Sequence, residues 1–312
     1  MNRQQVIKIG TRGSPLALAQ ANQVRALLLA AHDTLHNDMV ALEVMSTKGD
    51  RVLDRPLAEL GGKGLFTEEI EAALTDGRID LAVHSMKDMP TELPPGLVIE
   101  CVLKREDPRD GFISQKAAHF SKLPSGAVVG TASLRRQAQL LNVRPDLEVV
   151  TFRGNVQTRL NKLAEGQVDA TFLALAGMRR LGLQDQLTNV IDTTDMLPAV
   201  AQGVIGIETR VDDTRVADLL RPLNDQATGV VLGAERAFLS ALDGSCRTPI
   251  AGLATLHGDQ IQFRGQVLSP DGRQSFDTTR EGPAADGVAM GQDAGEELKR
   301  QAGPDIFNAV TS

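Results

Sequence analysis

One pattern occurs three times in the middle of the chain and limits the folds open to it. A short apolar run with strand character is followed each time by arginine and then by a helical segment. The apolar runs are residues 127–131, 148–152 and 170–175. Strands that alternate with helices form parallel sheets, in which the carboxyl ends of neighbouring strands meet at one edge. The pattern therefore predicts an α/β domain with arginines gathered along one edge of its sheet.

The amino-terminal part follows the same alternation. Strands are expected at residues 6–10, 42–46, 79–83 and 97–103, and helices from Pro15 to about residue 32 and over residues 67–75. A further strand-like run at 203–209 is expected to return to this first sheet. After residue 224 the pattern changes to a helix, two or three hairpin strands and a final helix, which is typical of a small α+β domain.

Three domains follow from these patterns, one of them discontinuous. We expect domain 1 at residues 1–103 and 203–222, domain 2 at 109–197 and domain 3 at 225–312, with the charged segment 104–110 as a linker. A chain of 312 residues has room for two or three domains, because single cores stop growing at about 250–300 residues.

Composition argues against several classes of partner. The chain has no Trp or Tyr and a net charge of −7, which disfavours a nucleic-acid or an anionic-membrane partner. We find no signal peptide and no apolar run of transmembrane length, so a cytoplasmic protein is expected. Two cysteines do not form a disulfide framework, and five scattered histidines predict no metal site.

The arginines of the repeated pattern suggest an anionic ligand. Arg135 and Arg136 are expected at the second and third positions of a helix, where the helix dipole disfavours cations unless an anion binds between them. Further arginines of the same pattern are Arg153, Arg159, Arg179 and Arg180, and Arg12 precedes another helix. A solvated arginine face is the alternative. No complete phosphate-binding motif is present, so polycarboxylates have at least equal weight as ligands.

A strand that ends in charged residues supplies a candidate catalytic group. Residues 79–90 begin as an apolar strand and end in His84, Ser85, Lys87 and Asp88 before a proline. A carboxylate among cations suits the stabilisation of a developing cation or the transfer of a proton. The alternative is an aspartate that only stabilises the turn.

The two cysteines have different surroundings. Cys246 follows Gly244 and Ser245 in a turn, and Arg247 would favour its thiolate. No histidine partner stands out for a protease dyad, so we interpret Cys246 as a covalent attachment point. Cys101 lies in an apolar strand and is expected to be an inert core residue.

Taken together, these motifs resemble the porphobilinogen deaminase (hydroxymethylbilane synthase) family over nearly the whole chain. The segments that carry the resemblance are 11–17 (TRGSPLA), 61–66 (GGKGLF), 83–90 (VHSMKDMP), 105–110 (REDPRD), 133–136 (SLRR), 153–155 (RGN), 197–199 (LPA) and 244–246 (GSC).

The resemblance implies a fold, a reaction and a cofactor. It implies two α/β domains like those of type 2 periplasmic binding proteins, plus the small α+β C-terminal domain. It implies that Cys246 carries a dipyrromethane cofactor in thioether linkage. The implied reaction joins four porphobilinogen molecules head to tail, releases ammonia at each step and yields hydroxymethylbilane. The family is generally monomeric.

The resemblance also implies roles for particular residues. Asp88 matches the catalytic carboxylate. The expected cofactor contacts besides Cys246 are Lys87, Thr131, Ser133, Arg135, Arg136 and Arg159. The expected substrate contacts are Arg12, Ser14, Arg153 and Arg180, with Lys63 and Phe66 on an active-site loop.

Three positions depart from the family pattern. Gly13 replaces a residue that is often polar, Glu59 stands where some members have lysine, and Ala201 replaces a glycine. Two alternatives to this enzyme remain. A cytoplasmic two-lobe anion-binding or sensing module would explain the arginines but not Asp88 or Cys246, and a phosphoryl-transfer enzyme lacks its motifs.

Overall fold

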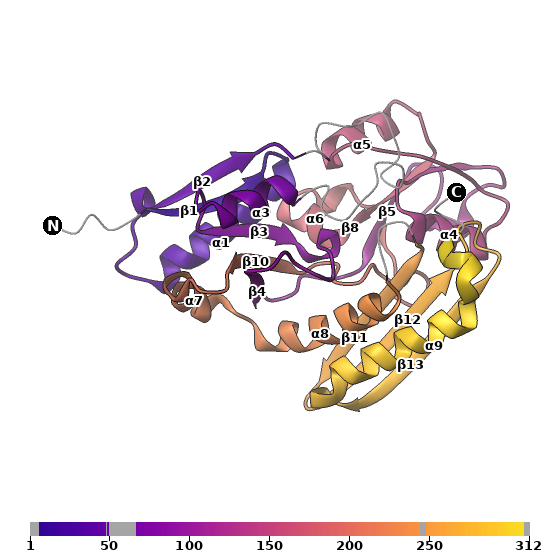
Figure 1. Cartoon of the computed structure of the whole chain (residues 1–312). Helices are drawn as coiled ribbons and strands as arrows, with labels where there is room; N and C mark the ends of the chain where they lie inside the picture. Colours follow the sequence, from indigo (N-terminus) through magenta and orange to yellow (C-terminus); the bar gives the residue numbers. More distant parts are fainter. Residues whose placement is uncertain (1–5, 48, 50–66, 244–247, 309–312) are drawn as a thin grey trace. The chain divides into compact units, whose positions relative to one another are not determined.

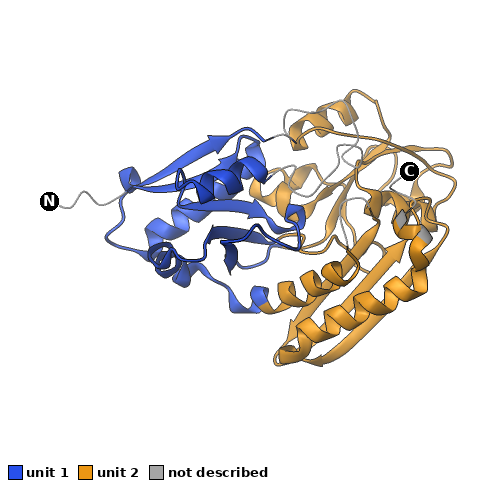
Figure 2. Ribbon diagram, in the orientation of Figure 1, with its two compact units in different colours: residues 1–52, 62–106, 204–229 blue, residues 53–61, 107–203, 230–312 orange. Residues whose placement is uncertain are grey.

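The structure, a computed structural model, describes residues 6–47, 49, 67–243 and 248–308 (Figure 1). It divides into two compact units, each built from separate stretches of chain (Figure 2). Unit 1 comprises residues 1–52, 62–106 and 204–229, and unit 2 comprises residues 53–61, 107–203 and 230–312. None of the helices in the described ranges has the length and apolar character needed to cross a membrane.

Unit 1 contains a five-stranded sheet in the order β2-β1-β3-β10-β4. Its strands are β1 (Ile7–Arg12), β2 (Val40–Met45), β3 (Leu81–Ser85), β4 (Leu97–Val102) and β10 (Ile205–Arg210). Strand β1 is parallel to β2 and β3, whereas β10 runs antiparallel to β3 and β4. The strand-like run after residue 203 therefore does lie in the first sheet, between two strands that precede it by a hundred residues or more.

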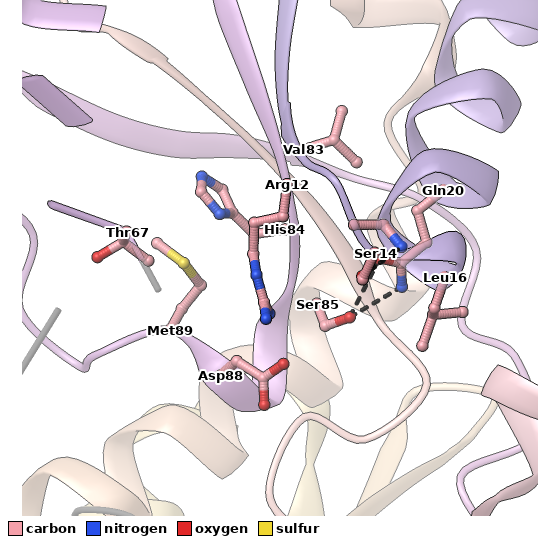
Figure 3. Close-up of a pocket in the computed structure, with 11 residues that line it drawn as sticks. Arg12, Ser14, Leu16, Gln20, Thr67, Val83, His84, Ser85, Asp88 and Met89 are labelled. Carbon is pink, nitrogen blue, oxygen red and sulfur yellow. Dashed lines mark hydrogen bonds between the residues drawn. The ribbon is translucent and has the colours of Figure 1, made fainter. Parts of the chain in front are cut away.

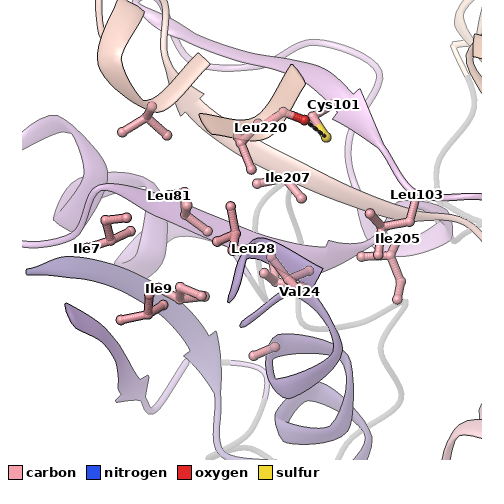
Figure 4. Packing of buried hydrophobic residues seen from close by; sticks show 14 residues of the cluster. Ile7, Ile9, Val24, Leu28, Leu81, Cys101, Leu103, Ile205, Ile207 and Leu220 are labelled. Carbon is pink, nitrogen blue, oxygen red and sulfur yellow. Dashed lines mark hydrogen bonds between the residues drawn. The ribbon is translucent and has the colours of Figure 1, made fainter. Parts of the chain in front are cut away.

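The helices of unit 1 cover the two faces of this sheet. They are α1 (Pro15–Ala31), α3 (Glu68–Thr75) and α7 (Thr214–Leu220). Helix α1 begins where the sequence predicts, because the Ser14 hydroxyl accepts a hydrogen bond from the Ala17 N–H and Pro15 occupies the first turn. Leu81 and Val83 of β3 pack with α1 residues in the main apolar core (Figure 4), whereas Ala82, between them, packs with α3.

Unit 2 contains a second five-stranded sheet, in the order β7-β6-β8-β5-β9. Its strands are β5 (Asp110–Ser114), β6 (Val128–Gly130), β7 (Glu148–Val150), β8 (Ala170–Ala174) and β9 (Asn189–Val190), and its helices are α4 (Leu134–Val143), α5 (Val156–Ala164) and α6 (Leu175–Arg180). The three strands predicted as parallel are confirmed: β6 is parallel to β7 and β8. Sequence reasoning missed β5, which runs antiparallel to β8, and the two-residue β9. The sheet is therefore mixed rather than wholly parallel.

The rest of unit 2 has the helix-and-hairpin composition predicted for the C-terminal part. It contains most of α8 (Gln226–Ala241), whose first residues belong to unit 1, and the whole of β11 (Ile250–His257), β12 (Gln260–Leu268), β13 (Ser275–Pro283) and α9 (Gly287–Asn308). The three strands form an antiparallel meander. Both predicted turns contain a glycine with positive φ, Gly258 and Gly272.

Short 3₁₀ turns connect these elements. They are η1 (Asn37–Met39), η2 (Met86–Asp88), η3 (Phe120–Lys122), η4 (Gln184–Gln186), η5 (Arg221–Leu223) and η6 (Ala284–Asp286). The mixed α/β class with a small α+β part is thus confirmed, whereas the three domain boundaries stay a prediction.

Candidate functional site

A small pocket in unit 1 gathers several of the predicted site residues (Figure 3). Its cavity volume is about 60 Å³. It is lined by Arg12, Ser14, Leu16, Ala17, Gln20, Thr67, Val83, His84, Ser85, Asp88 and Met89. Because about 10–15 Å³ of such cavity volume holds one water molecule, the pocket has room for a polar group of a ligand.

The turn after β3 places the predicted catalytic carboxylate at this pocket. Met86 is buried and donates its backbone N–H to the Val204 carbonyl at 3.0 Å, which fixes the start of η2. Asp88, at the end of η2, is exposed. Arg12 is the last residue of β1, and its side chain points toward Asp88 (Figure 3). Lys87, in the same turn, is half-buried. The structure thus brings Arg12, Ser14 and Asp88 together at one pocket.

Gln20 is a pocket residue that sequence reasoning missed. Its side-chain N–H group donates to the Ser85 hydroxyl at 2.8 Å. The same hydroxyl is also placed to donate to the Gln20 amide oxygen, at 3.2 Å. Gln20 is buried on the face of α1 that also carries Ala17, Ala21 and Val24. A glutamine within that apolar stripe was the available signal.

Buried ionisable groups adjoin the pocket. The His84 ring nitrogen Nε2 lies 2.9 Å from Oε2 of Glu208, and both side chains are almost fully buried. Glu71 of α3 is also buried. Burial raises the pKa of Glu71 and outweighs the opposing effect of the Thr67 side chain, while the charges of Glu208 and His84 act in opposite directions. Neither Glu208 nor Glu71 was singled out from the sequence.

In unit 2, Arg135 and Arg136 occupy the predicted second and third positions of α4. The helix begins after Ser133, whose hydroxyl accepts from the Arg136 N–H and whose own N–H donates to the Thr131 hydroxyl oxygen at 3.1 Å. The side chains of both arginines are buried rather than displayed on a solvated face. Each donates to a different oxygen of Asp110, at 2.7 Å in both instances.

Asp110 was missed because it ends the charged segment predicted as a linker. Residues 103–109 have no regular structure, but Asp110 is the first residue of β5 and is fully buried. Burial opposes its ionisation, yet the charges of Arg135 and Arg136 outweigh burial and hold the pKa of Asp110 well below its usual range. The side-chain amide of Gln202 donates to the same carboxylate at 2.8 Å.

Cations outnumber carboxylates in this cluster. Arg159 of α5 is half-buried, and burial together with the charge of Arg136 lowers its pKa to about 10. The Nε atoms of Arg135, Arg136 and Arg159 are buried without a hydrogen-bond partner in the described part of the chain. Asp110 pairs with Arg135 and Arg136, and Arg159 adds a third guanidinium group whose charge interacts with that of Arg136. Such a site suits carboxylate or phosphate ligands.

The remaining predicted site residues are more scattered or fall outside the description. Arg153 is half-buried after β7, and Arg180 of α6 donates to the Gly203 carbonyl at 2.7 Å. Cys246, Lys63 and Phe66 lie outside the described residues. Cys101 is buried, and burial raises its pKa to about 12, which confirms it as a core residue. Within residues 6–47, 67–243 and 248–308, no His, Cys, Asp and Glu side chains are grouped to hold a metal ion.

Comparison with known proteins identifies the family. A family model described as "Porphobilinogen deaminase, dipyromethane cofactor binding domain" matches residues 7–218, and one described as "Porphobilinogen deaminase, C-terminal domain" matches residues 231–300. The chain belongs to the porphobilinogen deaminase family. The porphobilinogen deaminase of Paracoccus denitrificans is 58% identical over 305 residues, covering 98% of this chain and 97% of the relative. That of Nitrobacter hamburgensis is 56% identical over 299 residues, covering 96% and 94%.

Solved structures resemble the chain at lower similarity. The periplasmic aliphatic sulphonate binding protein SsuA from Escherichia coli is 15% identical, with a TM-score of 0.41, and the match covers 77% of this chain and 71% of that protein.

One departure from the porphobilinogen deaminase pattern has a structural counterpart. Ala201 adopts a φ of 62°, the left-handed region that glycine enters without cost. Its N–H donates to Oε2 of the buried Glu235 at 2.6 Å, which holds the backbone in this conformation. Gly13 does not have a positive φ, and Glu59 lies outside the described residues.

Proposed function

We propose that this protein catalyses the head-to-tail polymerisation of four porphobilinogen molecules to hydroxymethylbilane, with release of ammonia, on a covalently attached dipyrromethane primer. Family membership supports the reaction. The observation that carries the assignment to particular residues is the excess of buried arginine over carboxylate around Asp110. Each pyrrole unit bears an acetate and a propionate, so a chain of pyrroles supplies the anions that this cluster lacks.

The arginine cluster fits the carboxylates of the cofactor. Arg135, Arg136 and Arg159 each have a buried Nε–H without a partner in the described structure, and Thr131 and Ser133 add hydroxyl groups beside them. We assign these residues, with Lys87, to cofactor binding, and Cys246 to the thioether bond. When bound, the dipyrromethane supplies the free pyrrole carbon to which the first porphobilinogen unit is joined.

Asp88 is assigned to catalysis because it carries a negative charge at the mouth of the unit 1 pocket. A carboxylate there stabilises the pyrrole-derived cation that forms when ammonia leaves, and after the new carbon–carbon bond forms it assists loss of the proton from the ring α-carbon that made the bond. Arg12 and Ser14, at the same pocket, are assigned to substrate carboxylates. Arg153, Arg180, Lys63 and Phe66 are assigned to substrate binding from the family pattern.

The proposal includes the finer features expected from the sequence. These are three domains at residues 1–103 with 203–222, 109–197 and 225–312, a monomeric state and a cytoplasmic location. The net charge of −7 supports the absence of a nucleic-acid or anionic-membrane partner.

Intact-protein mass tests the cofactor assignment. The purified protein should exceed its sequence mass by a two-pyrrole adduct, and Cys246→Ala should fold without it and give no colour with Ehrlich's reagent. Cys101→Ala is the matched control and should keep the adduct. An adduct that survives in Cys246→Ala would refute the attachment site, and a wild-type protein without any adduct would favour an anion-binding module.

Single-turnover ammonia release tests the role of Asp88. Asp88→Asn keeps the volume but removes the charge, and removal of one such electrostatic group commonly costs about 10²–10³ in kcat. The variant should retain its cofactor, and Asp88→Glu should be more active than Asp88→Asn. If Asp88→Asn releases ammonia at the wild-type rate and only KM rises, Asp88 is a binding residue.

A further inference from the structure

Three buried ionisable side chains near the Asp88 pocket have no role in the chemistry proposed above. They are His84 on β3, Glu208 on β10 and Glu71 on α3, with exposed fractions of 6%, 0% and 7%. Burial of charged or polar groups is costly unless they are paired. Oε1 of both glutamates has no hydrogen-bond partner within the described residues, so the cost is only partly offset. Such an arrangement calls for a functional explanation.

Strand pairing explains how two of these groups meet. In the antiparallel pair of β3 and β10, Ala82 lies opposite Glu208 and His84 lies opposite Gly206. His84 and Glu208 are therefore diagonal neighbours on one face of the sheet, where their side chains can interact. Their 2.9 Å contact links the end of β3 to β10, four residues before Asp88.

Helix α3 contributes the third group. Ala82, on the same face of β3 as His84, packs against Ile70 and Leu74 of α3, so His84 and Glu208 lie on the side of the sheet that this helix covers. The Glu71 N–H donates to the Thr67 carbonyl at 2.8 Å, and Thr67, like His84, lines the pocket. Glu71 is close enough to Glu208 and His84 for their charges to act on it.

We propose that His84 and Glu208, together with Glu71, form a buried positioning cluster that holds the wall of the Asp88 pocket in its reactive geometry. The contact between His84 and Glu208 joins β3 to β10, and Glu71 lies on α3, the helix that begins directly after the pocket residue Thr67. It acts on the position of the pocket residues and makes no contact with the reacting atoms. The inference rests on the proposed function, because the reaction supplies its readout.

A comparison of two variants at one position tests the proposal. His84→Leu removes the hydrogen bond to Glu208, whereas His84→Gln can place an amide nitrogen near the position of the ring Nε2. A small displacement of catalytic groups can cost about 10²-fold in rate, so we expect His84→Leu to lower kcat by about 10–100-fold. KM and cofactor mass should change little, and His84→Gln should recover most of the loss. Ala72→Gln, an exposed change on α3 that alters no charge near Glu71, is the control and should keep wild-type turnover.

Several outcomes would overturn the proposal. If His84→Leu keeps the wild-type kcat, the contact between His84 and Glu208 does not position the residues of the Asp88 pocket. Equal losses in the Leu and Gln variants would mean that the imidazole itself takes part in the chemistry. If His84→Leu does not fold, Glu208→Leu and Glu208→Gln are compared instead. Glu208→Gln is expected to be the more active of the two.

Failure of the proposed function can be distinguished from failure of the cluster. Wild-type protein that consumes no porphobilinogen refutes the proposed function, whatever the variants do. The cluster is then judged by urea unfolding of His84→Leu, Glu208→Leu and the double variant. Additive losses of stability would show that the two side chains are not coupled and would overturn the cluster as well.

Discussion

The two units have similar sheets, but the clusters of ionisable groups described in each have opposite imbalances of charge. Each sheet has three neighbouring strands that share one direction and a fourth that runs against them. In the unit 1 cluster, the buried Glu71 and Glu208 accompany one imidazole, His84. In the unit 2 cluster, three arginines accompany one carboxylate, Asp110. Similar scaffolds therefore carry sites that need different partners to balance their charges.

The chemistry of the side chains decides how each imbalance is relieved. A carboxylate that lacks a cation can bind a proton and become neutral, and the raised pKa of Glu71 has that direction. Arginine remains charged under all ordinary conditions, so an excess of arginine needs an anion from elsewhere. From this comparison we expect Glu71 in unit 1 to bind a proton and the arginine cluster in unit 2 to bind an anionic ligand.

The largest effect is expected from removing the one carboxylate of the arginine cluster. Asp110→Asn leaves Arg135 and Arg136 buried without a counter-charge, and breaking a buried pair in this way costs about 3–5 kcal/mol. Urea unfolding measures the loss. Asp107→Asn is the control, because Asp107 pairs with the partly exposed Arg109 and should cost less than about 1 kcal/mol. Equal losses in the two variants would remove the special role of Asp110.

Arg159 should have effects of opposite sign with and without the cofactor. In Cys246→Ala, which we expect to lack the cofactor, Arg159→Met removes a cation that has no carboxylate partner in the described structure and should stabilise the protein. In the loaded protein the same change should destabilise by about 1–3 kcal/mol, the usual contribution of a hydrogen bond to a charged group. Arg144→Met, whose partners are Asp146 and backbone carbonyls, should cost the same in both forms. The same sign for Arg159→Met in both forms would contradict an anionic ligand there.

The proton assigned to unit 1 predicts a pH dependence. The folded pKa of Glu71 is raised above 4.5 by burial and by the charges of Glu208 and Glu68, with His84 opposing, so the folded state holds its proton more tightly than the unfolded state. Stability from this group is present below pH 4.5 and is lost as pH rises through the folded pKa. Glu71→Gln cannot ionise and should gain about 0.5–2 kcal/mol near pH 8, the usual size of a favourable substitution. Unfolding curves at several pH values measure the free energy of unfolding of both proteins. If this energy depends on pH in the same way in wild type and Glu71→Gln, Glu71 does not bind the proton assigned to it.

The smallest effect should be independent of charge altogether. Ala201→Gly relieves the left-handed conformation at that position, which costs an alanine about 1–2 kcal/mol, but it adds freedom to the unfolded chain. A net gain below about 1 kcal/mol is expected, equal at all pH values and with or without cofactor. A gain that varies with pH would show that the backbone at Ala201 is linked to ionisation of its partner Glu235.

Much of the fold follows from local patterns. Ser14 and Pro15 mark the start of α1, and the three apolar runs before arginine are parallel strands of one sheet. The motif ending in Asp88 also lies at a pocket, as its charged residues predict. These signals lie within short segments, so the sequence displays them directly.

The missed residues depend on contacts between distant segments. Asp110 meets Arg135 and Arg136 across 25 and 26 residues, and Glu208 meets His84 across 124. In the sequence, Asp110 is one of several charges in a row, and burial alone separates it from them. Glu208 gave a weaker signal, as a glutamate that follows the apolar start of a short strand. Which carboxylate becomes buried is decided by strand order, and periodicity does not specify that order.

The position of β10 has a consequence for the order in which the chain folds as it is made. In the described sheet of unit 1, β4 has β10 as its one neighbour, so β4 cannot pair when it is synthesised. The roughly 100 residues between Val102 and Ile205 take about 5–20 s to add at ~5–20 residues per second. All five strands of the unit 2 sheet, from Asp110 to Val190, are made within that interval. On the ribosome, the second sheet in the sequence can therefore be completed before the first.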